Sequence, residues 1–152
     1  MIKIYLDNCC YNRHFDDLSQ EKNYMEASAI EIILNKYINR KIEIFGSMAI
    51  EFEILKISNG NKKRQVEDLY DVLELQEIEY SDKIINRAKE LRKYNIKEMD
   101  ALHIAFVECG NVDYMITTDK KLINSSKKSN AKIKIFNPVK FIMEVNKKWQ
   151  YQ

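Results

Sequence analysis

The sequence predicts an α/β fold of three layers, with helices on both faces of a central, mostly parallel sheet of four to five strands. Short β-prone runs alternate with segments of helical periodicity along the whole chain of 152 residues, and that order is typical of parallel sheets. Only 3 Gly and 1 Pro are present, so long irregular segments are not expected. We expect residues 1–152 to form a single domain.

In the first half of the chain, strands and helices are expected to alternate, beginning with a strand at the N-terminus. Strands are predicted for "IKIYL" (residues 2–6) and "IEIF" (residues 42–45), with a polar stretch from the first strand to about residue 19. A helix over about 20–40 follows from apolar positions at helical spacing, namely Ile30, Ile33, Leu34, Tyr37 and Ile38. Ser47 is suited to cap a helix that runs to about residue 57. After a break at 58–64, a further helix carries Val66, Leu69, Tyr70 and Leu73.

The second half continues this alternation. Strands are predicted over residues 75–80, 113–118 and 132–136. A helix is expected after Ser81, and the strongly apolar segment 98–109 is expected to be another, ended by Gly110-Asn111. Pro138 should open a last helix that runs to about residue 146.

Composition excludes some classes of protein. No apolar run approaches the roughly 20 residues of a membrane span, and the N-terminus has no signal-peptide pattern. Three cysteines without framework spacing indicate a reducing, cytoplasmic setting. Lys and Arg number 25 against 23 Asp and Glu, so the net charge of +2 neither requires nor excludes a nucleic-acid partner.

Acidic residues fall at the ends of predicted strands. Asp7 follows the first strand and Asp119 follows strand 113–118. Ligands of parallel sheets bind at the carboxyl ends of strands, so both carboxylates should lie at the same edge. Asp100 sits in the first turn of an otherwise apolar helix, where a half-buried carboxylate needs a partner such as a metal ion.

The helix after Ser47 offers two glutamates. Glu53 lies on the inward stripe of Ile50 and Ile54, and is favoured over Glu51, which lies nearer the outer edge and remains the alternative. Oxygen ligands of this kind suit Mg²⁺ or Mn²⁺, and the chemistry they favour is metal-assisted hydrolysis of a phosphodiester. The competing interpretation is that the acids only cap helices and turns.

Four stretches together resemble the PIN-domain ribonuclease family: "IYLDN", "SMAIEFEIL", "MDALHIAFVECGNVDYMITTDKKL" and "IKIFNP". The resemblance implies a three-layer fold and cleavage of RNA with Mg²⁺ or Mn²⁺. It also implies that four residues are catalytic and bind the metal: Asp7, Glu53, Asp100 and Asp119. Many small members are VapC-like toxins of toxin–antitoxin pairs, so the implied partners are an RNA substrate, an antitoxin protein and a second copy in a homodimer.

The resemblance also implies supporting residues. Thr117 and Thr118 stand where the family often carries a hydroxyl that orients a carboxylate or a water, and Asn8 directly follows the first acid. Many members read Asp-X-Asn at the first acid, whereas Cys9 takes the Asn position here, so its role is open. Adjacent Cys10 and Cys9 are expected to be small packing residues rather than metal ligands.

Several basic and titratable residues remain candidates. Arg13 is suited either to contact a substrate phosphate or to pair with an acid. Lys120 and Lys121 lead a lysine-rich segment that directly follows Asp119 and is expected to attract RNA. His103, one turn after Asp100, is a general base or a hydrogen-bonded core histidine, and the latter is favoured.

The leading hypothesis is a metal-dependent endoribonuclease, acting as the toxin of a type II toxin–antitoxin pair. The alternatives are a non-catalytic PIN-like module that binds RNA or protein, and a PIN nuclease of RNA processing. A phosphatase is disfavoured because Cys9 occupies the position of the second Asp in the common hydrolase signature, and a receiver domain because the acidic pair before a central strand is absent.

Overall fold

A parallel five-stranded sheet forms the centre of the part of the chain that the structure describes, residues 1–149 of a computed structural model. The strands lie in the order β3-β2-β1-β4-β5. Their bounds are β1 Lys3–Leu6, β2 Glu43–Gly46, β3 Gln76–Glu77, β4 Tyr114–Ile116 and β5 Lys134–Phe136. Residues 150–152, the end of the predicted domain 1–152, lie outside the described residues.

The sheet is built around β1, whose Ile4, Tyr5 and Leu6 are fully buried. β1 pairs with β2 on one side and with β4 on the other, all in parallel. The order of strands reverses direction between β1 and β4, which is the position where parallel α/β sheets open a crevice for ligands. A ligand-binding site is therefore expected at the carboxyl ends of β1 and β4.

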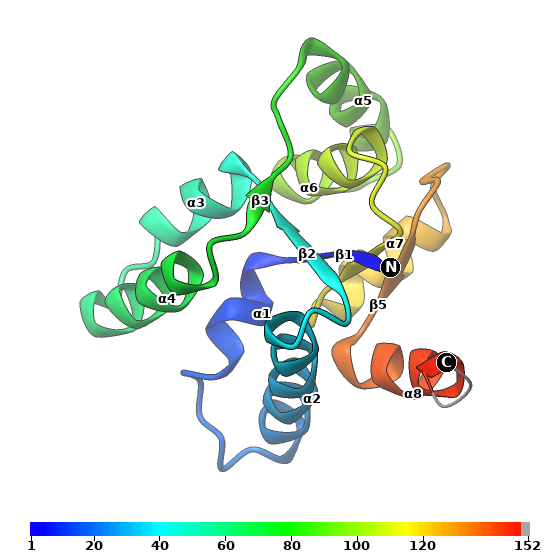
Figure 1. Cartoon of the computed structure of the whole chain (residues 1–152). Helices are drawn as coiled ribbons and strands as arrows, with labels where there is room; N and C mark the ends of the chain where they lie inside the picture. Colours follow the sequence, from blue (N-terminus) through cyan, green and yellow to red (C-terminus); the bar gives the residue numbers. More distant parts are fainter. Residues whose placement is uncertain (150–152) are drawn as a thin grey trace.

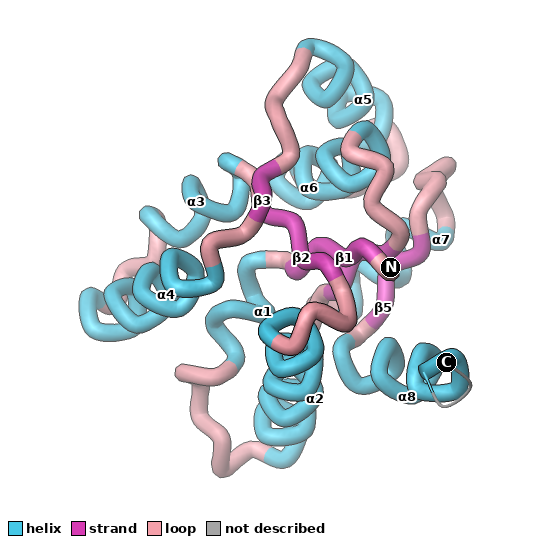
Figure 2. Tube along the Cα trace, in the orientation of Figure 1, coloured by secondary structure: helices cyan, strands magenta, loops and turns pink. Residues whose placement is uncertain are grey.

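Helices cover both faces of this sheet. Helices α2 and α8 contact each other on one face, and α5 and α6 contact each other on the opposite face (Figure 1). Their bounds, with the remaining helices, are α1 Asn8–Arg13, α2 Glu21–Ile38, α3 Met48–Leu55, α4 Gly60–Leu73, α5 Asp82–Arg92, α6 Glu98–Cys109, α7 Lys120–Lys127 and α8 Pro138–Trp149. Figure 2 shows the strands as a short central layer between the helices. The predicted three-layer α/β/α fold class is confirmed.

Several elements differ from the sequence-based expectation, among them helix α7, which was not predicted. Helix α1 begins where a polar stretch was predicted, because the Asp7 carboxylate caps it and because Cys10 and Tyr11 are buried against the core. Strand β3 is shorter than the predicted 75–80, because it lies at the sheet edge and pairs only with the end of β2. Within the described helices, none is long and apolar enough to cross a membrane.

Candidate metal centre

The first candidate ligand, Asp7, lies directly beyond β1. Its backbone N–H donates to the carbonyl of Ile116 at 2.9 Å, which holds the residue level with the end of β4. Its Oδ1 accepts the N–H of Asn8 at 2.8 Å, and its Oδ2 accepts the hydroxyl of Thr117 at 2.8 Å. The carboxylate is therefore held from two sides while the side chain is buried.

Glu53 of α3 and His103 of α6 approach Asp7 from a second direction. One ligand atom from each of the three residues lies within 4.8 Å of the others. His103 Nε2 is 3.6 Å from Asp7 Oδ1 and hydrogen-bonds Glu53 Oε1. On the other side of the ring, Nδ1 lies 2.6 Å from the Tyr5 hydroxyl, which is 2.7 Å from Ser47 Oγ. These hydrogen bonds fix the orientation of the fully buried imidazole ring of His103.

The alternative glutamate on α3 points elsewhere. Glu51 hydrogen-bonds Glu77 of β3, and that contact raises the pKa of Glu51. It is therefore Glu53, not Glu51, that the helix presents to Asp7 and His103.

Asp100 lies close enough to the other acids to be perturbed by them. Burial raises the pKa of Asp100 to about 6, and the carboxylates of Asp7 and Asp119 add to the rise. Nearby His103 acts in the opposite direction. A site in which carboxylates oppose one another's ionisation gains from a bound cation.

Asp119 lies at the start of α7, outside the group formed by Asp7, Glu53 and His103. Its Oδ1 accepts the N–H groups of Lys121 at 2.9 Å and Leu122 at 3.2 Å, so the residue caps that helix. Thr117 links Asp119 to Asp7, because its hydroxyl accepts the Asp119 N–H at 3.1 Å and donates to Asp7. Asp7 and Asp119 therefore each cap a helix, and both lie near enough to Asp100 to raise its pKa.

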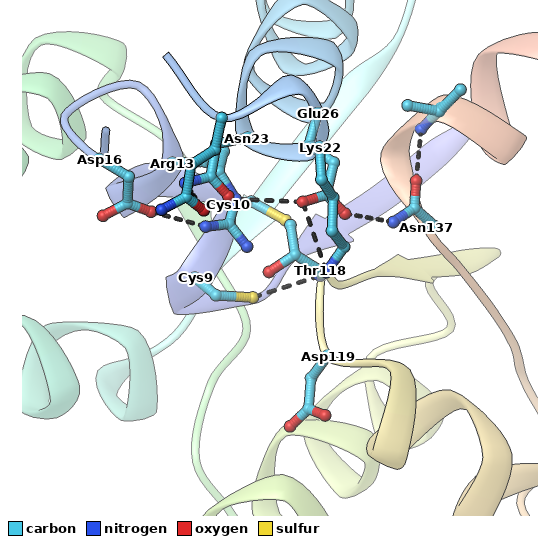
Figure 3. A network of polar contacts seen from close by, with 12 residues as sticks. Cys9, Cys10, Arg13, Asp16, Lys22, Asn23, Glu26, Thr118, Asp119 and Asn137 are labelled. Atoms are coloured by element: carbon cyan, nitrogen blue, oxygen red, sulfur yellow. Dashed lines mark hydrogen bonds and ion pairs between the residues drawn. The ribbon is translucent and has the colours of Figure 1, made fainter. Parts of the chain in front are cut away.

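Cys9 contacts the same hydroxyl. Its sulfur lies 3.4 Å from Thr117 Oγ1 and 3.6 Å from Asp7 Oδ2. It also accepts the N–H of Thr118 at 3.4 Å, the contact drawn in Figure 3. The adjacent thiol of Cys10 is buried and donates to a β4 carbonyl, as expected of a packing residue. Asn8 supports Asp7 through its backbone, whereas its buried Oδ1 has no hydrogen-bond partner among the described residues.

Arg13 is paired with acids in this structure. Its guanidinium lies 2.8 Å from Asp16 and 3.2 Å from Glu26, and Glu26 also accepts a hydrogen bond from Asn137 (Figure 3). Of the two interpretations of Arg13, the contacts match pairing with an acid. Lys120 is exposed beside Asp119, at the start of α7.

The donor set fits a divalent cation. Carboxylate oxygens are the ligands that Mg²⁺ and Mn²⁺ prefer, and a neighbouring imidazole nitrogen is better suited to Mn²⁺ than to Mg²⁺. Sequence reasoning placed His103 in the core but outside the site. The available signal was its spacing, since residues i and i+3 of a helix share a face and Asp100 is three residues earlier.

Comparisons with known proteins agree with the architecture. A family model described as "PIN domain" matches residues 4–128. A chain in the crystal structure of VapBC2 from Rickettsia felis, bound to a DNA fragment from their promoter, superposes with a TM-score of 0.59. It is 15% identical, and the match covers 90% of this chain and 98% of that one. No curated protein matches the sequence.

Proposed function

The chain belongs to the PIN-domain family, and from this membership we propose that it is an endoribonuclease that hydrolyses RNA phosphodiester bonds with Mg²⁺ or Mn²⁺. The observation that carries the proposal is that Asp7, at the carboxyl end of β1, lies together with Glu53 and His103, and that Asp100 is near enough to these groups for its pKa to respond to them. The proposed ligands are Asp7, Glu53, Asp100 and Asp119. When bound, the ion would activate water and offset negative charge on the reacting phosphate.

The residues around these acids have positioning roles in this proposal. Thr117 orients Asp7 and ties it to Asp119 through a single hydroxyl. The series of side-chain hydrogen bonds from Ser47 through Tyr5 to His103 orients Glu53. Because these groups are buried, the carboxylates are held before substrate arrives, and such preorganisation is what electrostatic catalysis requires.

The test is cleavage of a labelled single-stranded RNA by the purified chain. We expect cleavage with added Mn²⁺ or Mg²⁺ that EDTA abolishes. Asp7→Asn and Asp100→Asn should each lower the rate by about 100-fold or more. Glu53→Gln should also lower it, whereas the matched change Glu51→Gln, on the same helix, should not.

Two outcomes would contradict the proposal. One is wild-type cleavage by Asp7→Asn or Asp100→Asn protein, which would place the chemistry elsewhere or in a contaminant. The other is RNA binding by the wild type without cleavage under either ion, which would favour the non-catalytic binding module. Circular dichroism spectra of each variant establish that the fold is retained.

We further propose that the protein is the toxin of a type II toxin–antitoxin pair, with an antitoxin protein as partner. The likeness of its fold to a chain of the VapBC2 complex supports this role. Induced expression should arrest growth, and Asp100→Asn should relieve the arrest. Growth unaffected by a wild-type protein that cleaves RNA in vitro would favour an RNA-processing nuclease instead.

A further inference from the structure

A groove of about 600 Å³ runs between α7, β5 and α8 at the β5 edge of the sheet. Its charged lining is mostly basic: four lysines and one glutamate, which are Lys120, Lys127, Lys134, Lys140 and Glu144. Hydroxyl and amide side chains, among them Asn124 and Ser129, lie between them. We call this surface the basic groove.

The four lysines of the basic groove are free to bind an anion. Each is exposed, and none forms an ion pair with the side chains that the structure describes. By contrast, Lys62 and Arg13 are held by Asp16. Unpaired lysines around a concave surface concentrate positive potential there.

The opposite edge of the sheet carries the opposite charge. A depression between α3 and α4 is lined by Glu51, Glu67 and Asp71, and one beside β3 is lined by Glu77 and Glu79. The strand order places β3 and β5 at the two ends of the sheet, with β1 and β4 between them. A polyanion that reaches the centre is therefore attracted on the β5 side and repelled on the β3 side.

The basic groove begins at the candidate metal centre. Lys120 directly follows Asp119, and α7 carries the lining from Lys120 to Lys127, about 10 Å further along the helix axis. A chain of phosphates that enters the metal centre at Asp119 would continue along these lysines.

We propose that the basic groove holds the RNA strand adjoining the phosphodiester that is cut, through contacts to the sugar–phosphate backbone. This inference rests on the proposed function. Lysine is a flexible point charge that neutralises phosphate without reading bases, and the neighbouring hydroxyl and amide groups suit phosphate and 2′-OH oxygens. The basic groove thus supplies affinity and strand direction, while the acids supply the reaction.

The test compares two triple variants of the full chain that lose the same charge. The groove variant changes Lys127, Lys134 and Lys140 to Ala, and the control variant changes the exposed Lys83, Lys89 and Lys93 of the α5 region, which do not line the groove. Binding of a fluorescein-labelled 12-nucleotide single-stranded RNA is measured in EDTA, so that affinity is read without cleavage. Salt titrations count the phosphate contacts.

The groove variant should bind at least about 10-fold more weakly than the control variant. Its slope of log affinity against log salt should fall by about 2, because each lost contact to a single strand removes roughly 0.7. With Mn²⁺ present, its KM should rise while kcat stays near that of wild type. Equal affinity and equal slopes in the two variants would overturn the inference.

The outcome separates this inference from the function on which it rests. If the wild type cleaves RNA while both triple variants bind RNA equally well, the nuclease function stands and the RNA-binding role of the groove is wrong. If the groove variant loses RNA affinity but the wild type never cleaves RNA, the RNA-binding role of the groove stands and the nuclease function is wrong. If polyglutamate bound the wild type and lost affinity only in the groove variant, with RNA unaffected, the groove would belong to an acidic protein partner and the inference would fail.

Discussion

The hydroxyl of Thr117 is a single group on which two proposed ligands depend. It donates to Asp7 and accepts the backbone N–H of Asp119. Thr117→Val keeps the shape and removes both bonds, so we expect metal affinity or cleavage to fall by roughly 10- to 100-fold. Thr117→Ser keeps the hydroxyl and should stay near wild type. Calorimetric titration with Mn²⁺ and a cleavage assay check this, and a fully active Val variant would contradict it.

Asp100 predicts a pH dependence of stability in the metal-free protein. Its pKa is raised to about 6 in the fold, against about 3.9 in an unfolded chain, so the folded state holds the proton more tightly. Stability from this group is therefore present below pH 4 and is lost as the pH rises from about 4 to about 6. Asp100→Asn stays neutral and should not show that loss.

The measurement is urea unfolding of wild type and Asp100→Asn in EDTA at pH 4.5 and 7.5. The free energy of unfolding of Asp100→Asn, relative to that of wild type, should be about 1 kcal/mol higher at pH 7.5 than at pH 4.5. This figure is reduced for solvent screening, because the Asp100 side chain is partly exposed. The same difference in stability at both pH values would show that the Asp100 carboxyl is not perturbed.

Site residues that local sequence positions could be predicted, and those that long-range packing positions could not. Asp7 and Asp119 follow β-prone runs, and strand ends can be read from local sequence. Tyr5 and His103 could not be assigned this way, because their contact joins residues 98 positions apart and depends on the packing of α6 against the sheet. The choice of Glu53 over Glu51 needed only helical periodicity.

At the scale of elements, α1 and α2 are joined by a buried ion pair. Glu26 is 2% exposed, and Arg13 Nε lies 3.2 Å from it. Arg13→Ala leaves the buried carboxylate with only Asn137 and the more distant, exposed Lys22 as partners, so the free energy of unfolding should fall by about 2–4 kcal/mol. Glu26→Gln in the same background should recover part of that loss, giving a coupling above about 1 kcal/mol.

Urea unfolding of the two single variants and the double variant tests this pairing. RNA affinity of the folded Arg13→Ala protein should match wild type, since its guanidinium is already occupied by acids. A stable Arg13→Ala variant with weakened RNA binding would instead assign Arg13 to a substrate phosphate.

The elements themselves were largely readable from the chain. A strongly apolar run ended by Gly110-Asn111 located α6, and its predicted range 98–109 matches Glu98–Cys109. Helix α1 was missed because the segment from Asn8 is polar apart from a few positions, and only tertiary contact shows that Tyr11 is buried. The edge strands came out shorter than predicted, because pairing with a neighbour, not propensity, decides where a strand ends.

At the scale of the whole molecule, the strand order separates three electrostatic regions. The acids of the metal centre lie in the middle, acidic depressions lie toward β3, and the basic groove lies at β5. A net charge near zero therefore conceals a strong internal polarity. Composition could not reveal this polarity, since it depends on which segments the fold brings to each edge.

The same clustering of charge predicts that divalent metal stabilises the folded chain as a whole. The proposed ligands come from four separate segments, so an ion that binds them binds only the folded state. At 100 times its Kd, such an ion adds about 2.7 kcal/mol, which for a chain of this size raises Tm by about 5–10 °C. Differential scanning calorimetry with Mn²⁺ against EDTA measures this shift, with NaCl at matched ionic strength as the control.

The size of the shift in variants identifies where the ion binds. Asp7→Asn should remove most of it, because Asp7 lies between the two strand ends and beside both Glu53 and His103. Glu51→Gln should keep it, because Glu51 faces Glu77 instead. If saturating Mn²⁺ left the Tm of the wild type unchanged, the carboxylates would be helix caps without a metal, and the fold would serve binding rather than hydrolysis.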